Sequence, residues 1–177
     1  MEKMNQLANL RRWGLLVALA ATLSSCQTTI TRSFPTPGDN WNNAYGQLQY
    51  VTPKRSVIGE AVITRNGTQD FQLDYTAGPG VPLIRVRETS HSAAAEGAFA
   101  MLGWQGDPAR PPHHLISWME LREVFAAIEA HSKQNHVSVH GPAGTWNAQA
   151  ELAAGKLERV RVEFPRKKER FTFVFAR

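Results

Sequence analysis

Apolar and polar side chains alternate along most of this chain from residue 56 onward, and this alternation restricts the fold more than any other feature. The cleanest example is residues 157–164, where Val160, Val162 and Phe164 alternate with charged residues. Successive side chains of a β-strand point to opposite faces, so the pattern gives each strand one buried and one solvated face. One solvated face is typical of antiparallel sheets. The pattern therefore predicts an antiparallel sheet.

About eight strands are predicted in this way. Asn66-Gly67 supplies the tight turn of a hairpin between the first two. Residues 89–95, which are polar or small, are expected to form a loop. The predicted strands are residues 56–64, 71–75, 84–87, 97–104, 137–139, 146–152, 157–164 and 171–175.

One substantial helix interrupts the strands. Its apolar residues recur at three and four positions and form a single stripe, as in a helix that covers a core. The helix should end near Ser132 or Lys133. Strands around one helix predict an α+β domain. The stripe consists of Leu115, Trp118, Leu121, Phe125 and Ile128.

The N-terminus has the order of an export signal: basic residues, a short apolar run at residues 13–21, and then Leu23-Ser24-Ser25-Cys26. The run is too short for the roughly 18 to 20 residues that span a bilayer. Leu23-Ser24-Ser25-Cys26 looks like the lipobox of a bacterial lipoprotein, which implies removal of residues 1–25 and lipid attachment at Cys26. Gln27 stands where an Asp would imply retention in the inner membrane, so the resemblance implies the outer membrane, facing the periplasm.

Residues 26–54 are predicted to be a tether, because turn-forming residues are frequent and no sustained period is present. Trp41, Tyr45, Leu48 and Tyr50 are expected to pack back on the domain as a short helix. Residues 55–177 are then a single periplasmic domain.

Composition excludes several kinds of protein. Cys26 is the only cysteine of the 177 residues, so disulfides, a cysteine nucleophile and a cysteine-based zinc site are all excluded once it is lipidated. The chain holds 20 Lys and Arg against 15 Asp and Glu. Residues 1–25 contribute three of the former and one of the latter, which leaves a mild excess that does not suggest a nucleic-acid partner.

No catalytic or cofactor motif is evident. His136 and His140 could share one face of a strand with His131 nearby, but no zinc spacing accompanies them. Ser90-His91 and Asp107 lack the surroundings of a catalytic serine. We therefore predict no enzyme activity, no metal and no cofactor. The basic segment of residues 166–170 either meets anionic lipid headgroups or protects a sheet edge from aggregation.

Several of these features together resemble LolB, the outer-membrane receptor of the lipoprotein-localisation pathway. The matching residues are Pro112, Leu115 and Trp118, the Gly59-x-Ala61 opening of the first strand, and the hairpin of residues 159–175. The resemblance implies a strongly curved, incompletely closed half-barrel covered by helices. It also implies an apolar interior that takes up the acyl chains of lipoproteins.

The side chains expected on the inner face form either an ordinary core or an acyl-chain cavity. The first reading fits a non-catalytic scaffolding lipoprotein that docks another envelope protein. The second, which we adopt, fits an outer-membrane-anchored lipoprotein that binds lipid or acylated protein in lipoprotein localisation. The candidate cavity residues are Ala61, Phe71, Tyr75, Phe99, Trp118, Trp146, Ala148, Phe164, Phe171, Phe173 and Phe175.

Replacing the candidate lipidation site tests the anchoring prediction. Cys26→Ala should abolish incorporation of labelled palmitate, because no other thiol is present to accept a diacylglycerol. Ser25→Ala keeps a small residue before the cleaved bond and should be labelled normally. Labelled palmitate in the Cys26→Ala variant would contradict the lipobox interpretation.

Overall fold

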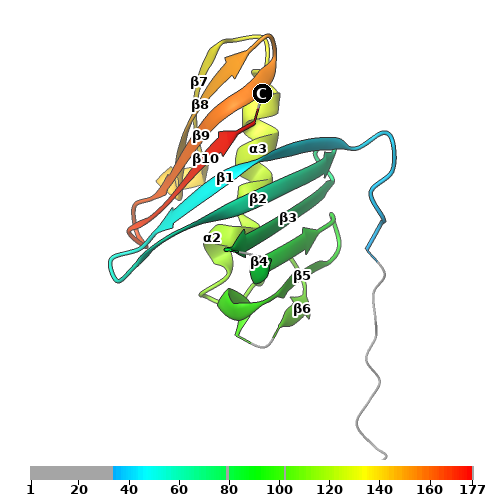
Figure 1. The fold of residues 1–177 in the computed structure, drawn as a ribbon, viewed down its shortest axis with the longest axis vertical. Helices are drawn as coiled ribbons and strands as arrows, with labels where there is room; N and C mark the ends of the chain where they lie inside the picture. Colours follow the sequence, from blue (N-terminus) through cyan, green and yellow to red (C-terminus); the bar gives the residue numbers. More distant parts are fainter. Residues whose placement is uncertain (1–33, 79, 102, 177) are drawn as a thin grey trace, which may run out of the picture. The chain divides into compact units, whose positions relative to one another are not determined.

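The computed structural model describes residues 34–78, 80–101 and 103–176, so the predicted signal peptide and Cys26 lie outside the described residues. Within this part, ten strands form one antiparallel sheet in the order β6-β5-β4-β3-β2-β1-β10-β9-β8-β7 (Figure 1). The strands are β1 (Asn42–Val51), β2 (Ser56–Asn66), β3 (Asp70–Ala77), β4 (Val81–Glu88), β5 (Ala93–Glu96), β6 (Trp104–Gly106), β7 (His136–His140), β8 (Asn147–Ala153), β9 (Lys156–Phe164) and β10 (Glu169–Phe175).

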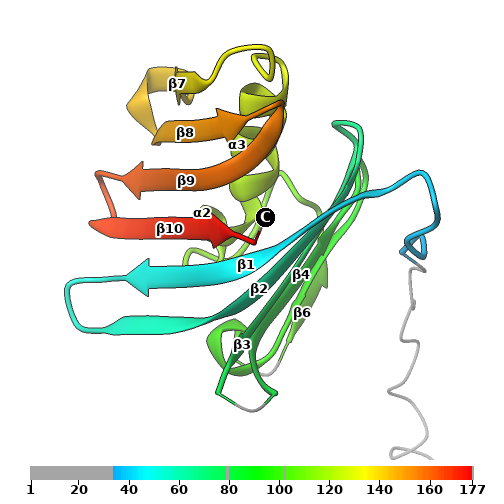
Figure 2. The ribbon, with the colours of Figure 1, turned by 45° about the horizontal axis from the view of Figure 1, so that its top comes forward.

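The sheet bends strongly, and the helices α2 (Ile116–Met119) and α3 (Leu121–Glu129) lie on its concave face (Figure 2). Its end strands, β6 and β7, do not pair with each other, so the curved sheet stays open. An α+β domain with a curved antiparallel sheet and one main helix was predicted, and this is confirmed. The sheet has ten strands rather than about eight.

Strand β1 lies where the sequence predicted a tether over residues 26–54 or a short helix. It occupies the middle of the sheet, between β2 and β10. Its inward positions are Ala44, Gly46, Leu48 and Tyr50, of which only the last two are fully buried. The first two are small, so the alternation has little contrast and the strand was missed. The folded part of the chain therefore begins before residue 55.

The predicted loop at residues 89–95 is confirmed only over residues 89–92, and the predicted strand at residues 97–104 is wrong except at Trp104. Residues 93–96 form β5, whose three alanines are all buried and therefore show no alternation. The next residues form the 3-10 helix η1 (Ala98–Ala100), and only Trp104 begins a strand. Gly97 and Met101, which flank η1, have φ angles of 106° and 52°, and these positive values interrupt an extended strand.

The apolar stripe of the helical region is confirmed. Leu115, Trp118, Leu121, Phe125 and Ile128 are each at most 1% exposed, and Phe125 packs against Phe71 and Phe173 on the sheet, with ring centroids 6.0 and 5.3 Å apart. Regular helix ends at Glu129, earlier than predicted, and turns follow. Among the described residues, no helix is long and apolar enough to cross a membrane.

Two ion pairs tie α3 to the sheet. Arg122 Nε lies 2.8 Å from Glu88 Oε1 on β4, and Arg65 Nη1 on β2 lies 3.1 Å from Glu129 Oε2. Glu88 is only 4% exposed. Burial raises the pKa of Glu88 to about 7, although the charge of Arg122 opposes the shift. Near neutral pH, α3 is therefore held over a carboxyl group that is partly protonated.

The raised pKa of Glu88 predicts how stability depends on pH. Between the ordinary pKa of 4.5 and about 7, the folded protein keeps a proton that the unfolded chain releases. The free energy of unfolding should fall by roughly 3 kcal/mol as the pH rises through this window. Chemical denaturation at several pH values measures this, and Glu88→Gln should flatten the profile. Glu96→Gln, at an exposed position, is the matched control and should keep the slope; an unchanged slope in Glu88→Gln would refute the assignment.

Candidate ligand-binding hollow

An open hollow of about 1060 Å³ lies at one end of the concave face; we call it the large hollow. It is bordered by the tips of the β1–β2 and β9–β10 hairpins, by η1 and by α2. Its floor is aromatic, made of Tyr50, Phe99, Trp118 and Phe164. An aromatic floor with a few polar groups around it is the usual composition of a site for a small molecule.

Trp118 is the centre of this floor. Its ring lies 4.8 Å from Tyr50, 5.9 Å from Phe99 and 4.8 Å from Phe171, measured between centroids. Trp118 is 1% exposed, whereas Phe99 is half-buried and presents part of its ring. The floor is thus continuous with the core below it, and Phe99 is its accessible part.

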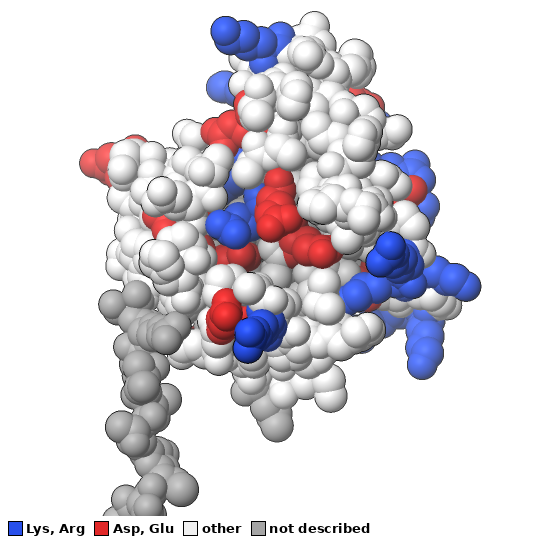
Figure 3. Space-filling model, turned by 180° about the vertical axis from the view of Figure 1, so that it is seen from behind, with Lys and Arg blue, Asp and Glu red and all other residues white. Residues whose placement is uncertain are grey.

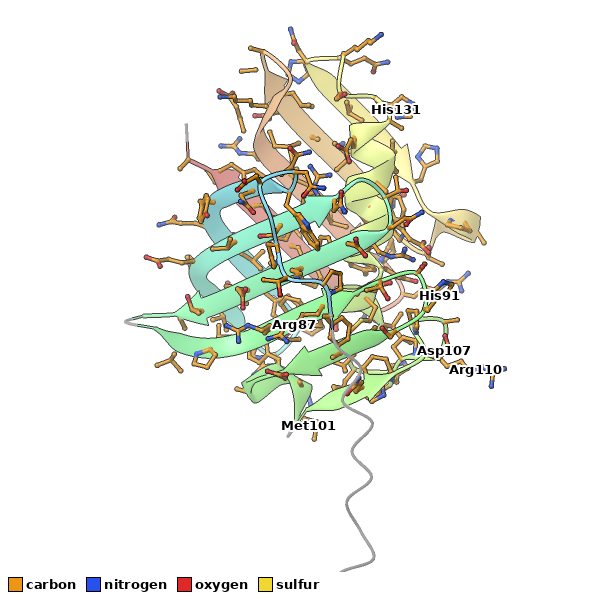
Figure 4. All side chains as sticks on the ribbon, turned by 90° about the vertical axis from the view of Figure 1, so that its right-hand side faces the viewer. Arg87, His91, Met101, Asp107, Arg110 and His131 are labelled. Carbon is orange, nitrogen blue, oxygen red and sulfur yellow. The ribbon has the colours of Figure 1, made fainter. Side chains whose placement is uncertain are left out.

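Backbone conformation sets the position of Phe99. A Cβ at Gly97 would lie 2.8 Å from the carbonyl oxygen of Leu83 on β4, so only glycine allows η1 to approach the sheet this closely. After η1, Met101 has a left-handed conformation and is 71% exposed at the rim of the large hollow. Figure 4 shows Met101 projecting from the end of the molecule that carries η1.

Two hairpin tips bring basic side chains to the rim. In the β1–β2 turn, Thr52 Oγ1 accepts hydrogen bonds from the backbone N–H groups of Lys54 and Arg55, at 3.3 and 3.1 Å. The β9–β10 turn contributes Arg166 and Lys167. Figure 3 shows Lys and Arg side chains gathered on the side of the molecule that carries these tips. The rim therefore combines cations from segments more than a hundred residues apart.

The polar groups of the rim are partly desolvated. Lys167 Nζ donates a hydrogen bond of 2.5 Å to the His113 carbonyl oxygen. Burial lowers the pKa of Lys167, although Glu169 and Glu120 act in the opposite direction. Burial, followed by the charge of Glu169, raises the pKa of the Tyr50 hydroxyl, so Tyr50 is neutral at physiological pH. An uncharged aromatic floor thus lies beneath a charged rim.

Only some of the predicted cavity residues line this hollow. Phe99, Trp118 and Phe164 line it, and Phe175 borders a smaller hollow of about 550 Å³ beyond the end of α3. The other predicted residues lie in a filled core, because α3 occupies the middle of the concave face. These core residues are Ala61, Phe71, Tyr75, Trp146, Ala148, Phe171 and Phe173.

Most residues of the rim were not predicted from the sequence. Tyr50, Lys54 and Arg55 fell in or beside the predicted tether, and Met101 fell in a predicted strand. The basic segment of residues 166–170 was noticed, and its juxtaposition with a second hairpin tip was not. The alternation of Leu48 and Tyr50 was the only local signal that could have placed residues 54 and 55 at the end of a strand.

The polar residues considered for catalysis or metal binding are all exposed. Ser90, His91 and Asp107 are all exposed, and Asp107 Oδ1 accepts the N–H of Ala109 in its own turn. His131 and His91 are well separated in Figure 4. In the part of the chain that the structure describes, no three His, Cys, Asp or Glu residues are close enough to hold a metal ion.

Compared with protein-family models and with curated proteins, the chain matches none. Among solved structures it is similar to the LolA superfamily protein NE2245 from Nitrosomonas europaea, with 6% sequence identity and a TM-score of 0.44. The likeness covers 81% of this chain and 87% of that one. At this level it assigns neither a family nor a ligand to the chain.

Proposed function

We propose that the domain of residues 34–177 binds the apolar chain of a lipid or an acylated protein in the large hollow, without catalysis. The observation that carries this proposal is the open space of about 1060 Å³ above an aromatic floor. In the same proposal, the lipid on Cys26 anchors the protein to the outer membrane, and the domain faces the periplasm and serves lipoprotein localisation. The lipobox-like sequence and the resemblance to LolB support that setting.

The size and lining of the large hollow suit a flexible apolar chain. Ligand sites commonly enclose about 300 to 1,000 Å³, so the space is sufficient. Each methylene group removed from water contributes about 0.8 kcal/mol, so ten of them contribute about 8 kcal/mol before the costs of association. An acyl chain could lie against Phe99 and Ile116 with little rearrangement of the core below.

Because the core is filled, the proposed ligand-binding site is restricted to one end of the half-barrel. Because α3 occupies the middle of the concave face, substitutions at Ala61 or Ala148, which are 2% and 1% exposed, would overpack the core rather than block a ligand. Ala98 is different, since it is exposed and borders the large hollow. A bulky residue at Ala98 can therefore occupy the ligand's space without entering the core.

Ala98→Trp is the corresponding test. The indole should fill part of the large hollow and weaken uptake of a fluorescent fatty acid by about tenfold or more, a loss equivalent to about two or more methylene contacts. Fluorescence titration of residues 27–177 measures the dissociation constant, and the melting temperature should stay unchanged.

Ala130→Trp is the control, because it adds the same ring at an exposed position that borders neither hollow. It should bind the fatty acid as the parent does. If the parent takes up no fatty acid, or if both variants lose uptake equally, the large hollow is not the binding site. A scaffolding role, with the domain docking another envelope protein, would then replace this proposal.

A further inference from the structure

We propose that the large hollow selects an amphiphile whose polar end is an anion, and that Lys54 and Arg55 are the residues that select it. The anion is a carboxylate or a phosphate monoester. This inference rests on the proposed function and specifies the polar end of the same ligand.

Charge complementarity at the rim favours an anionic ligand. Lys54 and Arg55 on one hairpin tip, with Arg166 and Lys167 on the other, give four cations around the opening. Only Glu120 and Glu169 oppose them among the residues that line it. Cations around the mouth of a low-dielectric pocket attract and orient an anion.

Within the described ranges of the chain, three of the four rim cations lack acidic partners. All five salt bridges among the described residues lie elsewhere, on the sheet faces and between α3 and the sheet. Neither Lys54, Arg55 nor Arg166 is within 4.0 Å of a carboxylate oxygen in the described part of the chain. The arginines paired in these bridges are Arg65, Arg85, Arg122, Arg159 and Arg161. The arginines of those salt bridges are therefore paired with carboxylates, whereas Arg55 and Arg166 at the large hollow are not.

The position of the Arg55 guanidinium also favours an anionic ligand. Its central carbon lies 4.3 Å from the centroid of the Phe99 ring, the accessible part of the aromatic floor. A guanidinium over an aromatic face is held by cation–π attraction, and its N–H donors stay available for two oxygens of a carboxylate or phosphate. A chain lying on Phe99 would therefore place its head beside Arg55.

The environment of Lys167 also favours an anion at the rim. Burial lowers its pKa, which means that its charged form is incompletely compensated in the free protein. A bound anion at the rim would supply that compensation. Tyr50, which lies beneath the rim, is neutral and therefore does not repel a bound anion.

Three fluorescent probes with one alkyl chain test the inference on residues 27–177: a carboxylic acid, its methyl ester, and the phosphate monoester of the corresponding alcohol. The acid and the phosphate should each bind at least about tenfold more tightly than the ester at low ionic strength, and salt should reduce this preference. A tighter phosphate points to a phospholipid-type head, and a tighter acid points to a free fatty acid; both satisfy the inference.

Lys54→Gln/Arg55→Gln should erase the preference, so that the acid, the phosphate and the ester bind with similar affinities. Arg110→Gln/Lys133→Gln is the control: it removes the same two charges from exposed positions outside the large hollow and should keep the preference.

Two results would overturn the inference while leaving the proposed function intact: equal binding of all three probes by the parent, or a preference that survives in Lys54→Gln/Arg55→Gln. Displacement of the acid probe by inorganic phosphate alone would also overturn it, because the site would then bind an anion without a chain. If none of the three probes binds, the proposed function itself fails.

Discussion

The packing of the helical apolar stripe into the bend of the sheet determines the rest of this structure. Phe125 and Ile128 on α3 fill the middle of the concave face, and Trp118 on α2 lies where the filled core gives way to open space. An open sheet that bends this far would otherwise expose the aromatic inner faces of β3 and β10 to water. Because α3 covers them, open space remains at the ends of the concave face, and the larger space lies where hairpin tips meet α2.

Most of the sheet could be predicted from the sequence, because most of its strands have one solvated face and one buried face. Residues 159–164 alternate strictly, phenylalanine occupies every second position of residues 171–175, and the inward side chains Val160, Val162 and Phe173 are fully buried. Strands β1 and β5 were missed for different reasons: β1 has small residues at two inward positions, and the alanines of β5 are buried on both faces. Alternation reports a contrast between two faces, so a strand without that contrast gives no signal.

The candidate site was less predictable than the sheet, because it forms where segments distant in the sequence meet. The aromatic floor follows from inward-facing positions, and Phe99, Trp118 and Phe164 were among the predicted residues. The cations sit in turns, and no periodicity links residues 54 and 55 to residues 166 and 167. Only the pairing of β1 with β10 and β2 brings the two tips together. The cationic rim over the aromatic floor therefore results from the way the strands pair in the sheet.

Methyl NMR of isoleucine-labelled residues 27–177, titrated with a fatty acid, tests most directly whether the large hollow holds an apolar chain. Ile116 lines the large hollow, Ile128 borders the small hollow, and Ile63 and Ile84 lie in the core at 1% exposure. The account predicts a saturable shift of the Ile116 methyl resonance while the other three stay in place. No shift at Ile116, or a larger shift at Ile128 than at Ile116, would contradict it.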